Sequence, residues 1–104
     1  MKQFLLDTNI CIYYIKGLYE LKSKFEDAGP ENFLSGIQIL PIFPALDIYA
    51  SEKARLQKSG MVIDDFDLLI AATAVSFGLV MVTNNTNHFD RVKGIKLEDW
   101  TIEL

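Results

Sequence analysis

The sequence contains few of the residues that mark several common classes of protein. It has one cysteine, Cys11, which excludes a disulfide framework within the chain and makes a reducing cytoplasm the expected environment. Its one histidine, His88, stands in a polar segment where we expect a surface role, and no spacing is typical of a Ser-His-Asp triad. The six glycines are scattered singly, which argues against a glycine-rich phosphate loop. No stretch approaches the roughly 20 apolar residues that span a bilayer.

Positive charge is also scarce, because 14 acidic residues outnumber 10 Lys and Arg residues and give a net charge of −4. A broad basic face that neutralises nucleic-acid phosphates is therefore not expected. The composition is compatible with an enzyme that contacts phosphate through a metal held by carboxylates, since such a site is itself acidic. With half of its residues apolar, the chain of 104 residues is expected to form a single domain over residues 1–104.

Short apolar runs alternate with helical patterns, which is the order expected of an α/β domain with a parallel sheet. The run Phe4–Leu6 ends at Asp7 and predicts a buried, central strand. The helix expected from Pro44 is predicted to pack through one face, whereas the next helix is apolar most of the way round and should be buried. The expected helices cover residues 10–15, 18–28, 44–58 and 65–77. The further expected strands cover residues 37–40, 79–82, 95–97 and 101–104. The packing face of the helix over 44–58 holds Leu46, Tyr49, Ala50 and Leu56.

Polar residues gather at the ends of two of the expected strands. The segment Asp7–Asn9 follows the first strand, and Thr83–Asn85 follows the strand over residues 79–82. Asp67 lies at the start of the buried helix and can point into the same crevice at the carboxyl ends of the strands. Converging carboxylates repel one another unless a cation compensates, and oxygen ligands suit Mg²⁺ or Mn²⁺. The pattern therefore predicts metal-assisted hydrolysis of a phosphodiester.

The same residues also have a purely structural interpretation. Asp7 can cap the first helix, the aspartates at positions 64, 65 and 67 can cap a later helix, and Asn84 and Asn85 can shape a turn. Taken singly, these positions favour capping. Thr8 and Asn9 can cap the first helix without Asp7, however, and Asp65 can do so for the later helix without Asp67, which favours a separate task for both acids.

Four segments taken together resemble a known family. They are Leu5–Asn9, Asp67–Ala72, Val82–Asn85 and the ending Phe89–Trp100, in that order. This combination is similar to the PIN-domain toxins of the VapC type, and the similarity covers nearly all of the chain. It implies a three-layer α/β/α domain with a short parallel sheet and a Mg²⁺-dependent endoribonuclease acting on RNA. It also implies an antitoxin protein that occludes the site, and usually a homodimer.

The resemblance assigns roles to particular residues. Asp7 and Asp67 match the metal-binding aspartates of the family, and Thr8 matches a hydroxyl near the metal. Asn84 or Asn85 matches the polar position after the later strand, and we expect Asn85 to assist catalysis together with Thr8. A metal-bound water would then attack the phosphodiester.

One departure from the family is large. Relatives usually carry an acidic residue, typically Glu, in a helix after the second strand, but here Ser35-Gly36 runs straight into Ile37–Pro41. We therefore expect an internal deletion between about Ser35 and Ile37 that removes those helices. Its expected consequences are a weaker metal site and exposed apolar surface that is covered in a homodimer or a segment-exchanged oligomer.

Three functions are compatible with these observations. The first is a metal-dependent ribonuclease with reduced activity, which the intact Asp7 and Asp67 favour. The second is a catalytically inactive module that binds an antitoxin or a toxin partner, which the missing acid favours. The third, a generic α/β binding domain, leaves the combined motifs as a coincidence.

Overall fold

The computed structural model describes residues 3–27 and 43–102, without the side chains of Thr8 and residues 25–27. The expected strand over residues 37–40 and the expected deletion near Ser35 lie outside these described ranges. Within them, no helix is long and apolar enough to cross a membrane. The elements in chain order are β1 (Phe4–Leu6), α1 (Thr8–Ile15), α2 (Leu21–Asp27), the 3₁₀ helix η1 (Phe43–Ala45), α4 (Leu46–Lys58), α5 (Asp65–Phe77), β2 (Val80–Val82), α6 (Thr86–Phe89) and β3 (Lys96–Glu98).

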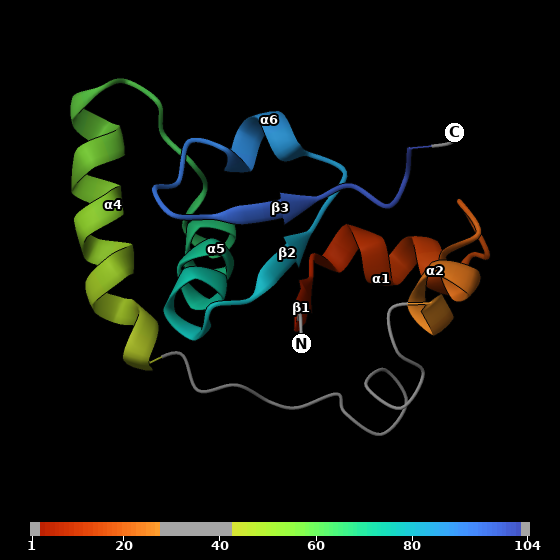
Figure 1. The fold of residues 1–104 in the computed structure, drawn as a ribbon. Coiled ribbons are helices and arrows are strands. Elements are labelled where there is room, and N and C mark those ends of the chain that lie inside the picture. The colour runs from red at the N-terminus through yellow and green to blue at the C-terminus, as the bar shows by residue number, and fades with distance from the viewer. Residues whose placement is uncertain (1–2, 28–42, 103–104) are drawn as a thin grey trace.

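The described strands form one parallel sheet in the order β1-β2-β3, which confirms the predicted parallel α/β class. Figure 1 shows the three strands side by side. The prediction that Phe4–Leu6 is the central strand is wrong for the described sheet, because β2 pairs on both sides whereas β1 pairs only with β2. Burial follows this order, since β2 is buried throughout and β1 is half-buried. Thr101 lies in a turn and Ile102 outside any strand, so the strand expected from Thr101 is also wrong for these two residues.

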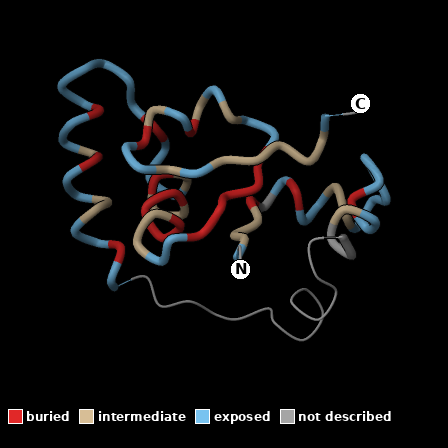
Figure 2. Tube along the Cα trace, viewed as in Figure 1, coloured by how far each residue is buried: buried red, intermediate tan, exposed pale blue. Residues whose placement is uncertain are grey.

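Helices cover both faces of the sheet, as the predicted three-layer arrangement requires. Leu5, Met81 and Leu97 are paired across the sheet and pack against α4, α5 and α6. On the other face, Leu6 and Val82 pack against α1 and α2. In Figure 1, α4 and α5 lie on one side of the sheet and α1 and α2 on the other, and Figure 2 shows burial concentrated along β2 and α5. The core therefore lies between the central strand and its neighbouring helices.

Helix α5 has the bounds that the sequence predicts, because both of its ends are defined by local chemistry. Asp64 is the N-cap and accepts a hydrogen bond from the backbone N–H of Phe66 at 3.2 Å. Gly78 ends the helix with a left-handed φ of 67°, a conformation that glycine adopts without steric cost. The chain then enters β2 directly, so the start of α5 lies toward the carboxyl ends of the strands.

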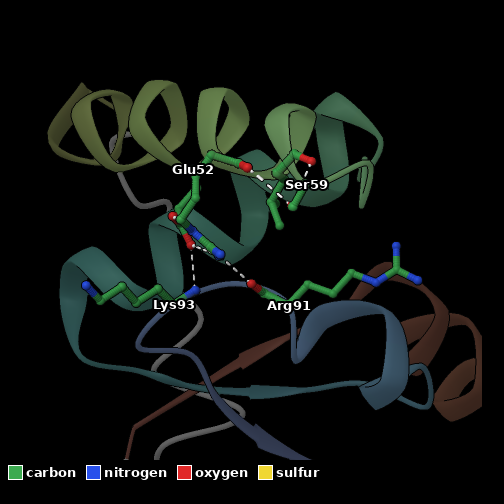
Figure 3. Close-up of polar contacts among 6 residues, drawn as sticks. Glu52, Ser59, Arg91 and Lys93 are labelled. Carbon is green, nitrogen blue, oxygen red and sulfur yellow. Dashed lines mark hydrogen bonds and ion pairs between the residues drawn. The ribbon is translucent and has the colours of Figure 1, made fainter.

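A buried carboxylate fastens α4 to the chain between α6 and β3. Glu52 is only 5% exposed and accepts hydrogen bonds from Arg55 Nε at 2.7 Å and Arg55 Nη2 at 2.8 Å. It also accepts the backbone N–H of Lys93, and Arg55 Nη2 donates to the carbonyl of Arg91 at 2.6 Å. Figure 3 shows Glu52 pointing from α4 toward this segment. The network positions the segment that follows α6 against α4.

We expect the substitution Glu52→Gln to destabilise the fold by about 1 kcal/mol at pH 7, since a charge-assisted pair with a half-exposed arginine is lost. The Arg55 hydrogen bonds hold the pKa of Glu52 below its ordinary value. A lowered pKa in the folded state means that the carboxylate stabilises the fold at neutral pH and ceases to do so as it is protonated. The difference between wild type and Glu52→Gln should therefore shrink below about pH 4.5. Urea denaturation between pH 7 and pH 3 measures it.

The matched control is Glu20→Gln, the same substitution at an exposed position. We expect this control to change the free energy of unfolding by less than about 0.5 kcal/mol at every pH. A Glu52→Gln effect that grew on acidification would contradict the proposed role of the carboxylate.

Candidate active site

The carboxyl ends of the three strands lie at the same level and define one edge of the sheet. The backbone N–H of Asp7 donates to the carbonyl of Val82 at 2.9 Å, and the N–H of Thr83 donates to the carbonyl of Glu98 at 3.0 Å. Asp7 and Thr83 each follow directly after a strand, so this register places them beside each other. The edge is where ligand sites form in open parallel sheets.

Asp7 is a buried carboxylate that does not cap a helix. It occupies the N-cap position of α1, but its side chain makes no capping hydrogen bond. The side chain is instead turned toward Thr83, whose Oγ1 donates to Asp7 Oδ2 at 3.0 Å. With 6% exposure, the carboxylate has little access to solvent. The Asp7 carboxylate is therefore buried and held by Thr83 without serving as a helix cap.

Thr83 belongs to the polar segment predicted at this edge of the sheet, but the sequence assigned it no role of its own. It is fully buried, and its Oγ1 both donates to Asp7 and accepts the backbone N–H of Asn85 at 3.1 Å. One hydroxyl therefore fixes the orientation of the Asp7 carboxylate and the start of the turn into α6. The only sequence signal was its place directly after β2, one position before the two asparagines.

Two of the three aspartates at the start of α5 have structural tasks. Asp64 caps the helix, as the structural interpretation expected. Asp65 accepts hydrogen bonds from Lys53 Nζ and Tyr49 Oη, each at 2.9 Å, and the Lys53 contact holds the pKa of Asp65 below its ordinary value. The expectation that Asp65 would cap the helix in place of Asp67 is wrong in its residue, because the cap is Asp64 and Asp65 is bonded to Lys53 and Tyr49.

Asp67 faces the histidine instead. His88 Nε2 lies 3.5 Å from Asp67 Oδ2, and the two side chains are 24% and 40% exposed. His88 belongs to α6 rather than to an irregular loop, and its ring meets the ring of Phe89 edge-on at a centroid distance of 5.1 Å. The imidazole is thus partly buried and directed toward a predicted metal ligand.

Asn84, Asn85 and Thr8 are the other residues that the sequence predicts for the site. Asn84 donates through Nδ2 to Tyr13 Oη at 3.2 Å, whereas the exposed Asn85 occupies the N-cap of α6 without a side-chain capping bond. The backbone of Thr8 begins α1, and its side chain lies outside the described atoms. Within residues 3–27 and 43–102, no group of three or more His, Cys, Asp or Glu side chains is arranged to hold a metal ion. The segment from Thr83 to His88 nevertheless contacts Asp7 at one end and Asp67 at the other.

Comparison with known proteins identifies the family. The PIN-domain family matches residues 17–95. The chain belongs to the PIN-domain family. It is 35% identical over 132 aligned residues to the tRNA(fMet)-specific endonuclease VapC of Shigella flexneri, covering 97% of this chain and 100% of that protein. It is 34% identical over 131 residues to Ribonuclease VapC2 of Haemophilus influenzae, covering 96% and 99%.

Solved structures agree with this assignment of the PIN domain. A DNA-bound VapBC from Salmonella typhimurium matches with a TM-score of 0.80 and 30% identity, covering 96% of this chain and 99% of that chain. VapBC2 from Rickettsia felis, bound to a promoter DNA fragment, matches with a TM-score of 0.69 and 25% identity, covering 93% and 98%. The predicted resemblance to VapC-type PIN toxins is confirmed.

Proposed function

We propose that this PIN domain is a metal-dependent endoribonuclease in which Asp7 and Asp67 hold Mg²⁺ or Mn²⁺. The observation that carries the proposal is the Asp7 carboxylate, which is buried at the carboxyl edge of the sheet, oriented by Thr83 and not used as a helix cap. The names of the relatives, an RNA endonuclease and several ribonucleases, support the choice of RNA as substrate.

The donor set fits a hard divalent cation, because Asp7 and Asp67 both offer carboxylate oxygens and Mg²⁺ is often held by only one or two protein carboxylates. A cation bound there would polarise the phosphodiester and lower the pKa of its bound water. Thr83 keeps the Asp7 carboxylate in one orientation. Asn85 is the better candidate of the two asparagines for contacting substrate, since Asn84 is engaged with Tyr13. Thr8 would assist from the start of α1.

The orienting hydroxyl gives a direct test. We expect Thr83→Val to lower Mg²⁺ affinity and RNA cleavage by about 10- to 100-fold, as is usual when a partner of a metal ligand is removed. Thr83→Ser keeps the hydroxyl and is the matched control, with expected retention of most activity. Calorimetric titration with Mg²⁺ and cleavage assays measure both variants. A loss in Thr83→Ser with none in Thr83→Val would show that the methyl packing, not the hydroxyl, matters.

We further propose that the chain is shortened and its activity reduced. The alignments extend over 131 to 132 residues although this chain has 104, which supports the loss of an internal segment. The loss of the helix-borne acid would weaken the metal site. Mg²⁺ affinity equal to that of a full-length relative, titrated under the same conditions, would contradict this.

The second candidate is an inactive module that binds an antitoxin. The observation that favours it is that the described residues contain no group of three or more metal-binding side chains. The similarity to VapBC structures supports an antitoxin partner under either function. Absence of RNA cleavage by well-folded protein with Mg²⁺ or Mn²⁺ would favour this candidate over the ribonuclease.

Self-association is also proposed, as a homodimer or a segment-exchanged oligomer. Large apolar side chains stand in solvent, among them Ile15 at 81%, Phe43 at 78% and Val62 at 62% exposure. Burial of such surface between chains would stabilise an oligomer. Sedimentation equilibrium should detect it at micromolar concentration, and a stable monomer there would contradict it.

A further inference from the structure

Two tyrosines stand next to the residues of the candidate active site. Tyr13 lies in α1, and its Oη accepts a hydrogen bond from Asn84 Nδ2 at 3.2 Å. Asn84 directly follows Thr83, whose hydroxyl donates to Asp7. The ring of Tyr19 meets the ring of Tyr13 edge-on, at a centroid distance of 5.3 Å and an interplanar angle of 65°. The two aromatic rings are therefore joined through Asn84 to the carboxyl edge of the sheet.

The backbone that carries Tyr19 is strained. Tyr19 and Glu20 have φ values of 59° and 54°, in the left-handed region that residues with a Cβ rarely adopt. Gly17, two residues earlier, reaches a φ of 72° without this cost. Leu21 holds the turn in place, because it is 1% exposed and its N–H donates to the carbonyl of Leu18 at 3.3 Å. Strain of this kind is concentrated at functional sites, and here it presents an aromatic ring where glycine would fit the backbone better.

Tyr19 is also open to solvent, in a locally basic part of an acidic chain. It is 37% exposed, whereas Leu21 beside it is buried. Residues 16–24 contain three lysines and one acid, Glu20, although the whole chain has a net charge of −4. Two of these lysines, Lys16 and Lys22, are exposed. Exposed aromatic rings beside positive charge are a common means by which proteins bind single-stranded nucleic acid.

We propose that Tyr19 is a stacking platform for an unpaired base of a single-stranded RNA substrate, with Tyr13 supporting its ring. The phosphodiester to be cleaved would lie at Asp7 and Asp67, and the base of a neighbouring nucleotide would stack on Tyr19. Stacking accepts every base, so the platform would select single-stranded over paired RNA rather than a particular sequence. This inference deepens the proposed function and rests on it, because RNA is the substrate proposed there.

The test is binding of a single-stranded oligoribonucleotide that carries one 2-aminopurine, with the full chain at low salt and with EDTA to prevent metal-dependent cleavage. The fluorescence of this base falls when it stacks on an aromatic ring. We expect Tyr19→Leu, which is apolar but has no flat ring, to weaken binding at least about fivefold and to abolish the fall in fluorescence. Tyr19→Asn should behave alike, and asparagine tolerates the left-handed backbone better. Tyr19→Phe keeps the ring and is the matched control, with expected affinity within about twofold of wild type.

Other outcomes would overturn the platform. Wild-type protein that does not bind the RNA, or binds it without a fall in fluorescence, would contradict stacking. Equal losses in Tyr19→Leu and Tyr19→Phe would assign the effect to the hydroxyl. Unchanged RNA affinity in Tyr19→Leu would also refute the platform, and a lower mass of that variant in sedimentation equilibrium would make Tyr19 a contact between copies of the chain.

These failures are separable from failure of the ribonuclease proposal. If only the platform is wrong, metal-dependent RNA cleavage that requires Asp7 would persist in Tyr19→Leu at the wild-type rate. If only the nuclease is wrong, wild-type protein would quench the 2-aminopurine through Tyr19 and yet cleave no RNA with Mg²⁺ or Mn²⁺.

Discussion

The substitution Asp7→Asn is expected to lower metal-dependent RNA cleavage by at least about 100-fold, more than the loss typical for a partner of a metal ligand. The amide has nearly the size of the carboxylate and retains an oxygen that can accept the Thr83 hydroxyl, so the fold should survive. The negative charge that would hold the cation is lost. The measurement is cleavage of mixed single-stranded and structured RNA with Mg²⁺ or Mn²⁺, with EDTA to remove the metal.

Asp65→Asn is the matched control, because it makes the same chemical change at an exposed aspartate bonded to Lys53. We expect this control to keep cleavage within about twofold of wild type, as surface substitutions outside a site usually do. Equal losses in the two variants would mean that overall charge, not the Asp7 site, determines activity. Cleavage that survives both Asp7→Asn and EDTA would refute the metal-dependent mechanism.

Features with local causes were predictable from the sequence. The bounds of α5 follow from Asp64 at its start, one of the three aspartates expected to cap it, and from Gly78 at its end. The parallel sheet follows from strands alternating with helices. The freedom of Asp7 and Asp67 from capping was also indicated, because neighbouring residues could take that task. These inferences depend on contacts between residues close in the chain.

Features decided by tertiary contacts were not predictable in this way. The expected packing face of α4 included Leu46 and Ala50, which are exposed, and omitted Glu52, which is buried. A glutamate normally marks a solvent face, and only the contacts with Arg55 and the distant Lys93 N–H make its burial favourable. The place of β1 at one end of the described sheet likewise depends on which strand pairs with which.

The residues of the candidate site likewise divide into those with a local sequence signal and those whose role depends on tertiary contacts. Asp7 and Asp67 could be selected because acids after a strand and at a helix start form a known pattern. Thr83 could be placed in the same polar cluster, but its contact with Asp7 could not be predicted, since the hydrogen bond joins residues 76 positions apart. His88 looked like a surface residue because the sequence does not show that α6 brings it to Asp67.

The substitution Phe89→Ala is expected to destabilise the PIN domain by about 3–5 kcal/mol, the usual cost of emptying a buried phenylalanine site. Phe89 is 1% exposed and belongs to the core cluster with Leu56, Leu68 and Met81. Small domains are stable by only about 5–15 kcal/mol, so a large share of the stability would be lost. Urea denaturation followed by circular dichroism measures the change.

Phe66→Ala is the matched control, because Phe66 is 78% exposed and should change stability by less than about 0.5 kcal/mol. A difference below about 1 kcal/mol between the two variants would contradict the assigned core. The four residues of α6 are too few to form a stable helix alone, so the burial of Phe89 in the core helps to hold this helix in place. Removing it should therefore also loosen His88, which precedes it in α6 and faces Asp67. Packing in the core and the geometry of the candidate site would then depend on the same side chain.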